Sequence, residues 1–109
     1  MKYLLLAALL YSPDKSESLG NQLAIKADCQ RIEHELPVYK CGEHHDFDIF
    51  RLYFASFVQG YSDITQILSW TESGNDGYGT VITHDDQQYL IVFNDIANVF
   101  VISKAAEEE

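Results

Sequence analysis

The stretch Gly77–Ser103, GYGTVITHDDQQYLIVFNDIANVFVIS, decides the fold that we expect for this chain. It holds three segments rich in β-branched and aromatic residues, the composition typical of β-strands. Turn-forming residues separate these segments, first His84-Asp85-Asp86-Gln87 and then Asn94-Asp95. We therefore predict a three-stranded antiparallel meander with strands at Tyr78–Thr83, Tyr89–Phe93 and Val99–Ile102.

The middle strand of this meander is apolar at consecutive positions, Tyr89-Leu-Ile-Val-Phe93. A strand that is apolar on both faces belongs at the centre of a sheet whose two faces are both covered. The second cover is either the N-terminal apolar segment Tyr3–Tyr11 or a second copy of the protein in a homodimer. The composition of Tyr3–Tyr11 fits a helix and a buried strand equally, and as a strand it would be the fourth of the sheet.

Two helices are predicted from apolar residues at helical spacing. In Ser18–Leu36, apolar residues recur every three to five positions, and Pro37 ends the pattern because proline disfavours helix at the residue before it. A short extended segment, Val38–Cys41, follows. The second helix covers residues 46–59, with Asp46 at its start, Gly60 at its end and a core-facing stripe of Phe47, Phe50, Phe54 and Phe57.

A third, shorter helix is expected from Ser62, which would cap it, to Trp70. A loop at Glu72–Gly77 then leads into the meander. The 109 residues are 47% hydrophobic, enough for the core of one domain, 1–109, with residues 104–109 as a frayed acidic tail. The predicted fold class is α+β, with two or three helices packed on a small antiparallel sheet centred on the meander.

The apolar run Tyr3–Tyr11 lies between Lys2 and Pro13. It has about the minimum length for a signal-peptide core, but it has one basic residue before it and no good cleavage site after it. We expect a buried first element in a cytoplasmic protein, with export as the alternative. No apolar run approaches the roughly 18 residues that a membrane span needs.

The charge is unevenly distributed along the chain. Residues 1–40 hold five basic and five acidic residues, whereas residues 41–109 hold two basic and twelve acidic residues, so the whole net charge of −10 lies in the second part. A negative field repels nucleic acids and anionic membranes and attracts basic partners. Direct binding to nucleic acid or to a membrane is therefore disfavoured. Solubility alone is the other explanation of the acidity.

The expected working surface lies on the turns that flank the meander strands. Carboxylates held on rigid hairpins can imitate a row of phosphates and occupy a basic groove, and nearby tyrosines would anchor the contact. The candidate partner-binding residues are Glu72, Asp76, Tyr78, Asp85, Asp86, Tyr89 and Asp95.

The function that this surface favours is that of a non-enzymatic inhibitor that docks on a basic, nucleic-acid-binding or nuclease-type protein. Toxin-nuclease immunity proteins and phage-encoded inhibitors of defence complexes are small acidic proteins of this general kind. The comparison is one of size and charge, with nucleic-acid mimicry as its physical basis. No enzyme motif and no cofactor motif is found, so no catalytic residue or cofactor is assigned.

A metal-binding or hydrolytic protein is the alternative. Cys29, His34, Cys41 and His44 follow the pattern C-x4-H-x6-C-x2-H, which fits no standard zinc finger. The alternative would use the Cys/His/Asp cluster around Cys41–Asp48, including His44, His45 and Asp46, together with His84. We expect Asp46 instead to cap a helix, and Cys29 and Cys41 to be free thiols. Export would change that last expectation to a disulfide between them.

Overall fold

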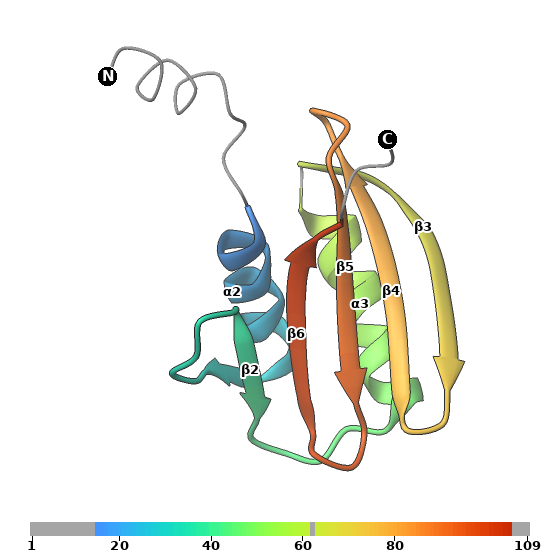
Figure 1. Ribbon diagram of the computed structural model, residues 1–109. Coiled ribbons are helices and arrows are strands. Elements are labelled where there is room, and N and C mark those ends of the chain that lie inside the picture. The colour runs from blue at the N-terminus through green and yellow to red at the C-terminus, as the bar shows by residue number, and fades with distance from the viewer. Residues whose placement is uncertain (1–14, 62, 106–109) are drawn as a thin grey trace.

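The computed structural model describes residues 15–61 and 63–105, with the side chains of residues 67 and 68 excepted. Within these ranges, two helices cover one face of a six-stranded antiparallel sheet (Figure 1). The α+β class is confirmed, and the sheet is larger than the small one expected. The expected element at Tyr3–Tyr11, the cap at Ser62 and the tail beyond Ala105 lie outside the described residues.

The strand order in the sheet is β1-β2-β6-β5-β4-β3. The strands are β1 (Cys29–Arg31), β2 (Val38–Cys41), β3 (Ile64–Ser73), β4 (Asp76–Thr83), β5 (Gln88–Asn94) and β6 (Val99–Lys104). The helices are α2 (Ser16–Ala27) and α3 (Phe47–Gly60); in the view of Figure 1, α3 lies behind the sheet and α2 lies to the left of β6, above β2.

Helix α3 forms where the sequence predicts it, because its start and its buried face are both local signals. The Asp46 side chain accepts a hydrogen bond from the backbone N–H of Ile49 at 2.9 Å, which satisfies one of the free donors at the helix start. Phe50, Phe54 and Phe57 are at most 2% exposed. The Phe50 ring stacks on Phe93 of β5 with ring centroids 4.2 Å apart. The phenylalanine stripe is therefore core.

Gly79 of β4 gives the aromatic rings room to approach the sheet. A Cβ atom at this position would lie 3.0 Å from the Phe54 ring and 3.0 Å from the Trp70 ring, closer than ordinary van der Waals contact. Phe54 and Trp70 pack against each other with centroids 5.7 Å apart. A side chain at Gly79 would therefore force the Phe54 and Trp70 rings to shift by a few tenths of an ångström.

Helix α2 approaches β2 closely through Gly20. A Cβ atom there would lie 2.5 Å from the ring of Tyr39, so glycine allows this contact. The Tyr39 hydroxyl donates to the side-chain oxygen of Asn21 at 2.7 Å and lies 3.2 Å from the Glu17 carbonyl oxygen. The Tyr39 ring is 0% exposed and stacks on Phe100, with centroids 4.7 Å apart. This contact joins α2 to the sheet.

The prediction of one helix over Ser18–Leu36 is wrong beyond Ala27. The chain leaves the helix at Asp28, which has φ 60°, a left-handed conformation that ends α2. Cys29–Arg31 then pairs with β2, so a long-range contact overrides the local helical pattern. Ile32 and Leu36, which the pattern placed on the helix, are 40% and 51% exposed.

The predicted third helix up to Trp70 is also wrong, because this segment is strand β3. Its pairing with β4 shifts register between Ile64 and Gln66 and again between Ile67 and Ser69. Each shift adds a residue to one strand and breaks the two-residue alternation that marks a strand. The apolar residues Ile64, Ile67 and Leu68 are therefore three positions and one position apart, a spacing that is also typical of a helix.

We predict that Phe50→Ala lowers the free energy of unfolding by about 3–5 kcal/mol, because it opens a cavity between α3 and the sheet. The matched control on the same helix is Leu52→Ala, since Leu52 is 72% exposed and its truncation changes stability by about 0.5 kcal/mol or less. Urea unfolding of both variants measures the difference. If the two variants lost equal amounts of unfolding free energy, Phe50 would not lie on the buried face of α3.

Candidate interaction surface

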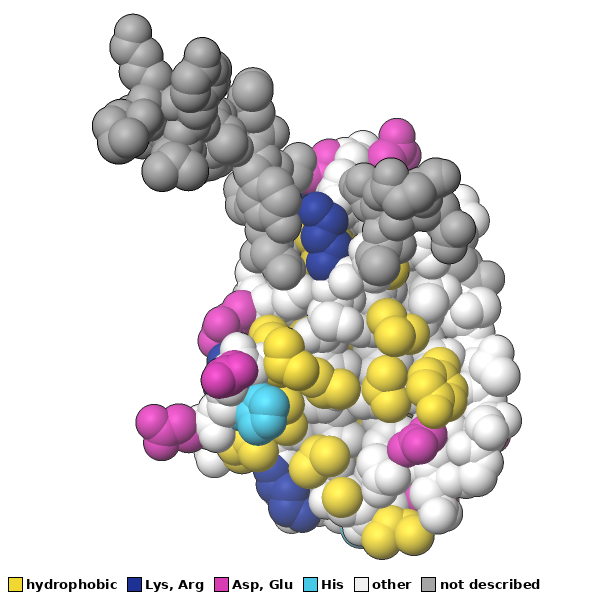
Figure 2. Space-filling view, viewed as in Figure 1, with side chains coloured by type: hydrophobic (Ala, Val, Ile, Leu, Met, Phe, Trp, Pro, Cys, Tyr) yellow, Lys and Arg dark blue, Asp and Glu magenta, His cyan; other side chains and the backbone are white. Residues whose placement is uncertain are grey.

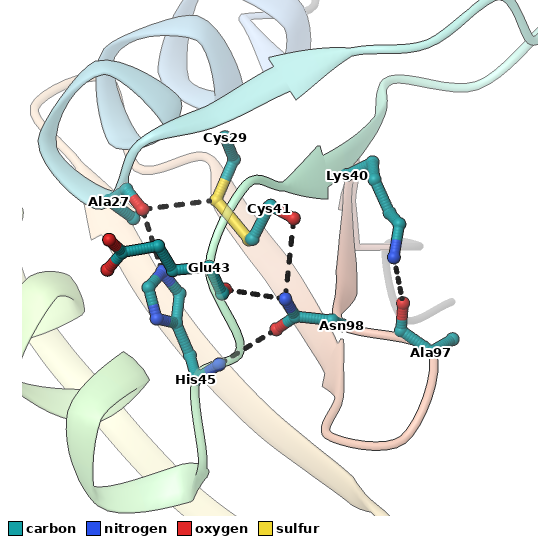
Figure 3. The surroundings of a disulfide bond; sticks show 8 residues. All are labelled: Ala27, Cys29, Lys40, Cys41, Glu43, His45, Ala97 and Asn98. Atoms are coloured by element: carbon teal, nitrogen blue, oxygen red, sulfur yellow. Dashed lines mark hydrogen bonds between the residues drawn. A yellow bond between two sulfur atoms is a disulfide. The ribbon is translucent and has the colours of Figure 1, made fainter.

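Cys29 and Cys41 form a disulfide across the β1–β2 pair (Figure 3). The two residues are directly opposite each other in the register, with Cα atoms 3.8 Å apart, so the side chains meet without any change in the strands. The expectation of free thiols is wrong. Because twelve positions separate the cysteines, the bond closes a short loop that includes residues 32–37.

His45 lies beside the disulfide and is 2% exposed. Its Nε2 is 2.8 Å from the carbonyl oxygen of Ala27, one of the last carbonyls of α2, which have no partner within the helix. In Figure 3 the imidazole, the Ala27 carbonyl and both sulfur atoms face one another. The histidine therefore acts as a side-chain cap that ties the end of α2 to the loop before α3.

The cluster predicted around Cys41–Asp48 assembles only in part. Potential ligand atoms of Cys29, Cys41 and His45 lie within 4.8 Å of one another. Both sulfur atoms belong to the disulfide, and a disulfide is not the thiolate that zinc requires. His34 and His44 are exposed, and His84 lies in the β4–β5 turn at the other end of the sheet.

The two acidic residues of that predicted cluster have separate structural roles. Asp46 caps α3, as expected. Asp48 accepts a hydrogen bond from Arg51 at 2.6 Å, and the same guanidinium donates to Glu72 at 2.8 Å. Asp48 and Glu72 therefore join α3 to β3 through Arg51, and neither Asp46 nor Asp48 forms a ligand cluster with His45.

Asn98 connects the β5–β6 turn to the loop before α3, and it is not among the residues predicted from the sequence. Its side-chain oxygen accepts from the N–H of His45 at 3.0 Å, and its side-chain nitrogen donates to the carbonyl of Glu43 at 2.6 Å. The same nitrogen lies 3.3 Å from the carbonyl oxygen of Cys41. Asn98 has φ 60°, a left-handed conformation that asparagine tolerates well. An asparagine between two predicted strands was therefore the available sequence signal for a residue with a structural role in the turn.

These connections gather carboxylates at one end of the sheet, which we call the acidic end. The backbone N–H of Asp95 donates to Asn75, so the β3–β4 and β5–β6 turns touch. The Asn98 side chain holds the loop before α3 against these turns. Arg51 holds the first turn of α3 there as well, because it binds both Asp48 and Glu72. Three stretches that are distant in sequence, residues 43–48, residues 72–76 and the β5–β6 turn, thus contribute to the acidic end, which consists of Glu43, Asp46, Asp48, Glu72, Asp76 and Asp95.

Asp85 and Asp86 lie in the β4–β5 turn, at the opposite end of the sheet from the acidic end (Figure 1). The eight residues of β4 separate the two ends by roughly 26 Å. Lys15 partly neutralises this second end, since its Nζ lies 3.1 Å from Asp63 and 3.8 Å from Asp85. The predicted set of acidic residues is therefore divided between two surfaces.

The charged groups of the second end are tuned by their neighbours. The hydrogen bond from the Thr83 hydroxyl, helped by the nearby Lys15 charge, lowers the pKa of Asp85 below its ordinary value. The hydrogen bond to Asp63 raises the pKa of Lys15 above its ordinary value. Both groups are therefore charged at neutral pH.

The two tyrosines of the predicted surface have different positions. Tyr89 is 0% exposed, and its hydroxyl accepts a hydrogen bond from the backbone N–H of Lys15 at 3.0 Å. It therefore belongs to the core and cannot contact a partner. Tyr78 is partly exposed and pairs with Thr71 and Val92, on the face of the sheet away from the helices.

No protein-family model, curated protein or solved structure matches this chain. Among residues 15–61 and 63–105, neither helix has the length and apolar character required to cross a membrane.

We predict that the unfolded protein, purified without reductant, has no thiol that reacts with a thiol reagent, and that two appear after reduction. The double variant Cys29→Ser, Cys41→Ser should lose about 3 kcal/mol of unfolding free energy, the usual effect of opening a loop of this size. Wild-type protein unfolded in reductant is the control and should lose a similar amount. Two reactive thiols before reduction would contradict the disulfide.

Proposed function

We propose that this protein is a non-enzymatic binding protein that docks its acidic end on a basic protein partner. The observation that carries the proposal is the convergence of six carboxylates from three separate stretches of sequence on one end of the sheet. Four of them, Glu43, Asp46, Asp48 and Glu72, are exposed to solvent. Convergent charge of one sign accelerates encounter with a partner of opposite charge.

The backbone that carries these carboxylates is held in place before any partner arrives. Asp46 is fixed by its hydrogen bond to the start of α3, and Asp76 by the side chain of Asn94 at 2.8 Å. Glu72 accepts hydrogen bonds from both Arg51 and Trp70, each at 2.8 Å. Little conformational entropy would be lost on binding, which favours affinity.

A partner with a groove built for phosphates fits this arrangement best. Carboxylates on rigid turns present negative charge at fixed spacing, as a nucleic-acid backbone does, so the partner class is a nuclease or another nucleic-acid-binding protein. Inhibition of the toxin-immunity or anti-defence type follows from occupation of that groove. Asp85 and Asp86 are too distant to share the contact, and Tyr89 is inside the core.

The disulfide bears on the cellular compartment in which the partner is met. The cytoplasmic location expected from the sequence stays a prediction. The Cys29–Cys41 disulfide favours the exported alternative, because disulfides persist in oxidising compartments and are rare in the cytosol. We therefore propose that the basic partner is met in an oxidising compartment.

The test compares two triple variants of equal net charge. Glu43→Gln, Glu72→Gln, Asp95→Asn neutralises three groups of the acidic end, and Glu17→Gln, Glu33→Gln, Glu35→Gln neutralises three groups elsewhere. Partner proteins are captured from host extract at low salt, identified, purified and titrated with each variant. We expect the first triple variant to weaken binding about tenfold or more, and the second to weaken it about twofold or less.

Equal losses in the two variants would overturn docking through the acidic end, since binding would then follow net charge alone. Retention of full affinity by the acidic-end variant would overturn it as well. Circular dichroism and thermal unfolding of each variant confirm that the fold is intact before binding is compared.

A further inference from the structure

The face of the sheet away from the helices, which we call the open face, is apolar along its centre. The register places Val38, Val101, Val92 and Tyr78 in one row across β2, β6, β5 and β4. All four are partly exposed, whereas the alternating residues Ile91 and Ile102 are 0% exposed on the helix side. Figure 2 shows hydrophobic side chains gathered over β6, β5 and β4. None of the described elements covers them.

The neighbouring row of the open face carries one charge of each sign. It runs from Lys40 on β2 through Val99 and Asn94 to Asp76 on β4. Lys40 and Asp76 are thus at opposite ends of the same row, three strand spacings or about 14 Å apart. This balance is unusual in a chain with a net charge of −10.

We propose that the open face binds a second copy of this chain, about a two-fold axis that runs parallel to the strands between β5 and β6. Rotation about this axis exchanges β5 with β6 and β4 with β2. It places Lys40 opposite Asp76 of the second copy, and Val92 opposite Val101 of the second copy. Two sheets that pack face to face in aligned orientation, about 10 Å apart, form such contacts.

The chemistry of the open face selects this occupant over the basic partner. A basic protein would gain one carboxylate, Asp76, and would meet the Lys40 ammonium, which repels it. A second copy pairs both charges twice and buries the apolar row from both sides, as isologous interfaces require. The open face and the acidic end share Asp76 alone, so a change at Val92 removes the dimer contact and leaves all six carboxylates of the acidic end in place.

The direction of the axis has a consequence for the proposed docking. A two-fold axis parallel to the strands keeps the strand direction the same in both copies. The two acidic ends then lie side by side and present one enlarged carboxylate surface. A partner with two basic sites would gain avidity from such a dimer without any new contact type.

The experiment is sedimentation of the full chain between about 5 and 500 µM, a range in which dimers of micromolar to millimolar Kd change state. We expect the wild type to form a dimer that Val92→Lys weakens at least tenfold. Leu52→Lys is the control, because Leu52 is exposed on α3 and far from the open face. Its dimer should match that of the wild type.

Charge exchange tests the axis itself. Lys40→Asp alone and Asp76→Lys alone should each weaken the dimer, because like charges then face each other, and the double exchange should restore it. This rescue does not depend on whether Val92→Lys folds. A wild type that is monomeric throughout the range, a dimer that Val92→Lys leaves unchanged, or a double exchange without rescue would each overturn the proposal.

Discussion

The stacking of α3 on the centre of the sheet is the interaction on which the rest of the structure depends. Phe50 lies flat on Phe93, with an interplanar angle of 6°, and also contacts Phe100 and Trp70. Through these rings, α3 contacts β5, β6 and β3 at once. Phe54 occupies the space that Gly79 leaves free. The orientation of α3 in turn sets the position of its N-terminal turn, and therefore of two carboxylates of the acidic end.

This packing makes the molecule strongly one-sided. The helix side of the sheet is buried along its central strands, the open face is apolar and partly exposed, and one end of the strands carries the acidic end. Each surface thus has a distinct chemistry: the acidic end suits a basic partner, whereas the nearly balanced open face suits a second copy of the chain. The Asn98 hydrogen bonds and the disulfide fix the loop before α3, which carries Glu43 of the acidic end.

Local signals made much of the fold predictable, and long-range contacts explain the errors. Helix α3 has its own cap and its own stripe, so the sequence alone indicated it. The end of α2 at Asp28 depends on the pairing of β1 with β2, and the nature of β3 was hidden by its irregular register. The acidic turns were predictable, but their grouping was not inferred, although consecutive turns of an antiparallel meander lie at opposite ends and alternate turns at the same end. The role of Asn98 depends on contacts more than fifty residues apart.

Helices close one face of the sheet, and in our proposal the other face stays open until a second copy of the chain covers it. Paramagnetic relaxation of methyl groups by a soluble agent, measured at concentrations where the protein is monomeric, tests this most directly. We expect strong relaxation for Val92 and Val101 and little for Ile91 and Ile102, which are 0% exposed. Equal protection of all four methyl-bearing residues in the monomer would contradict the claim, because the open face would then be covered by the chain itself.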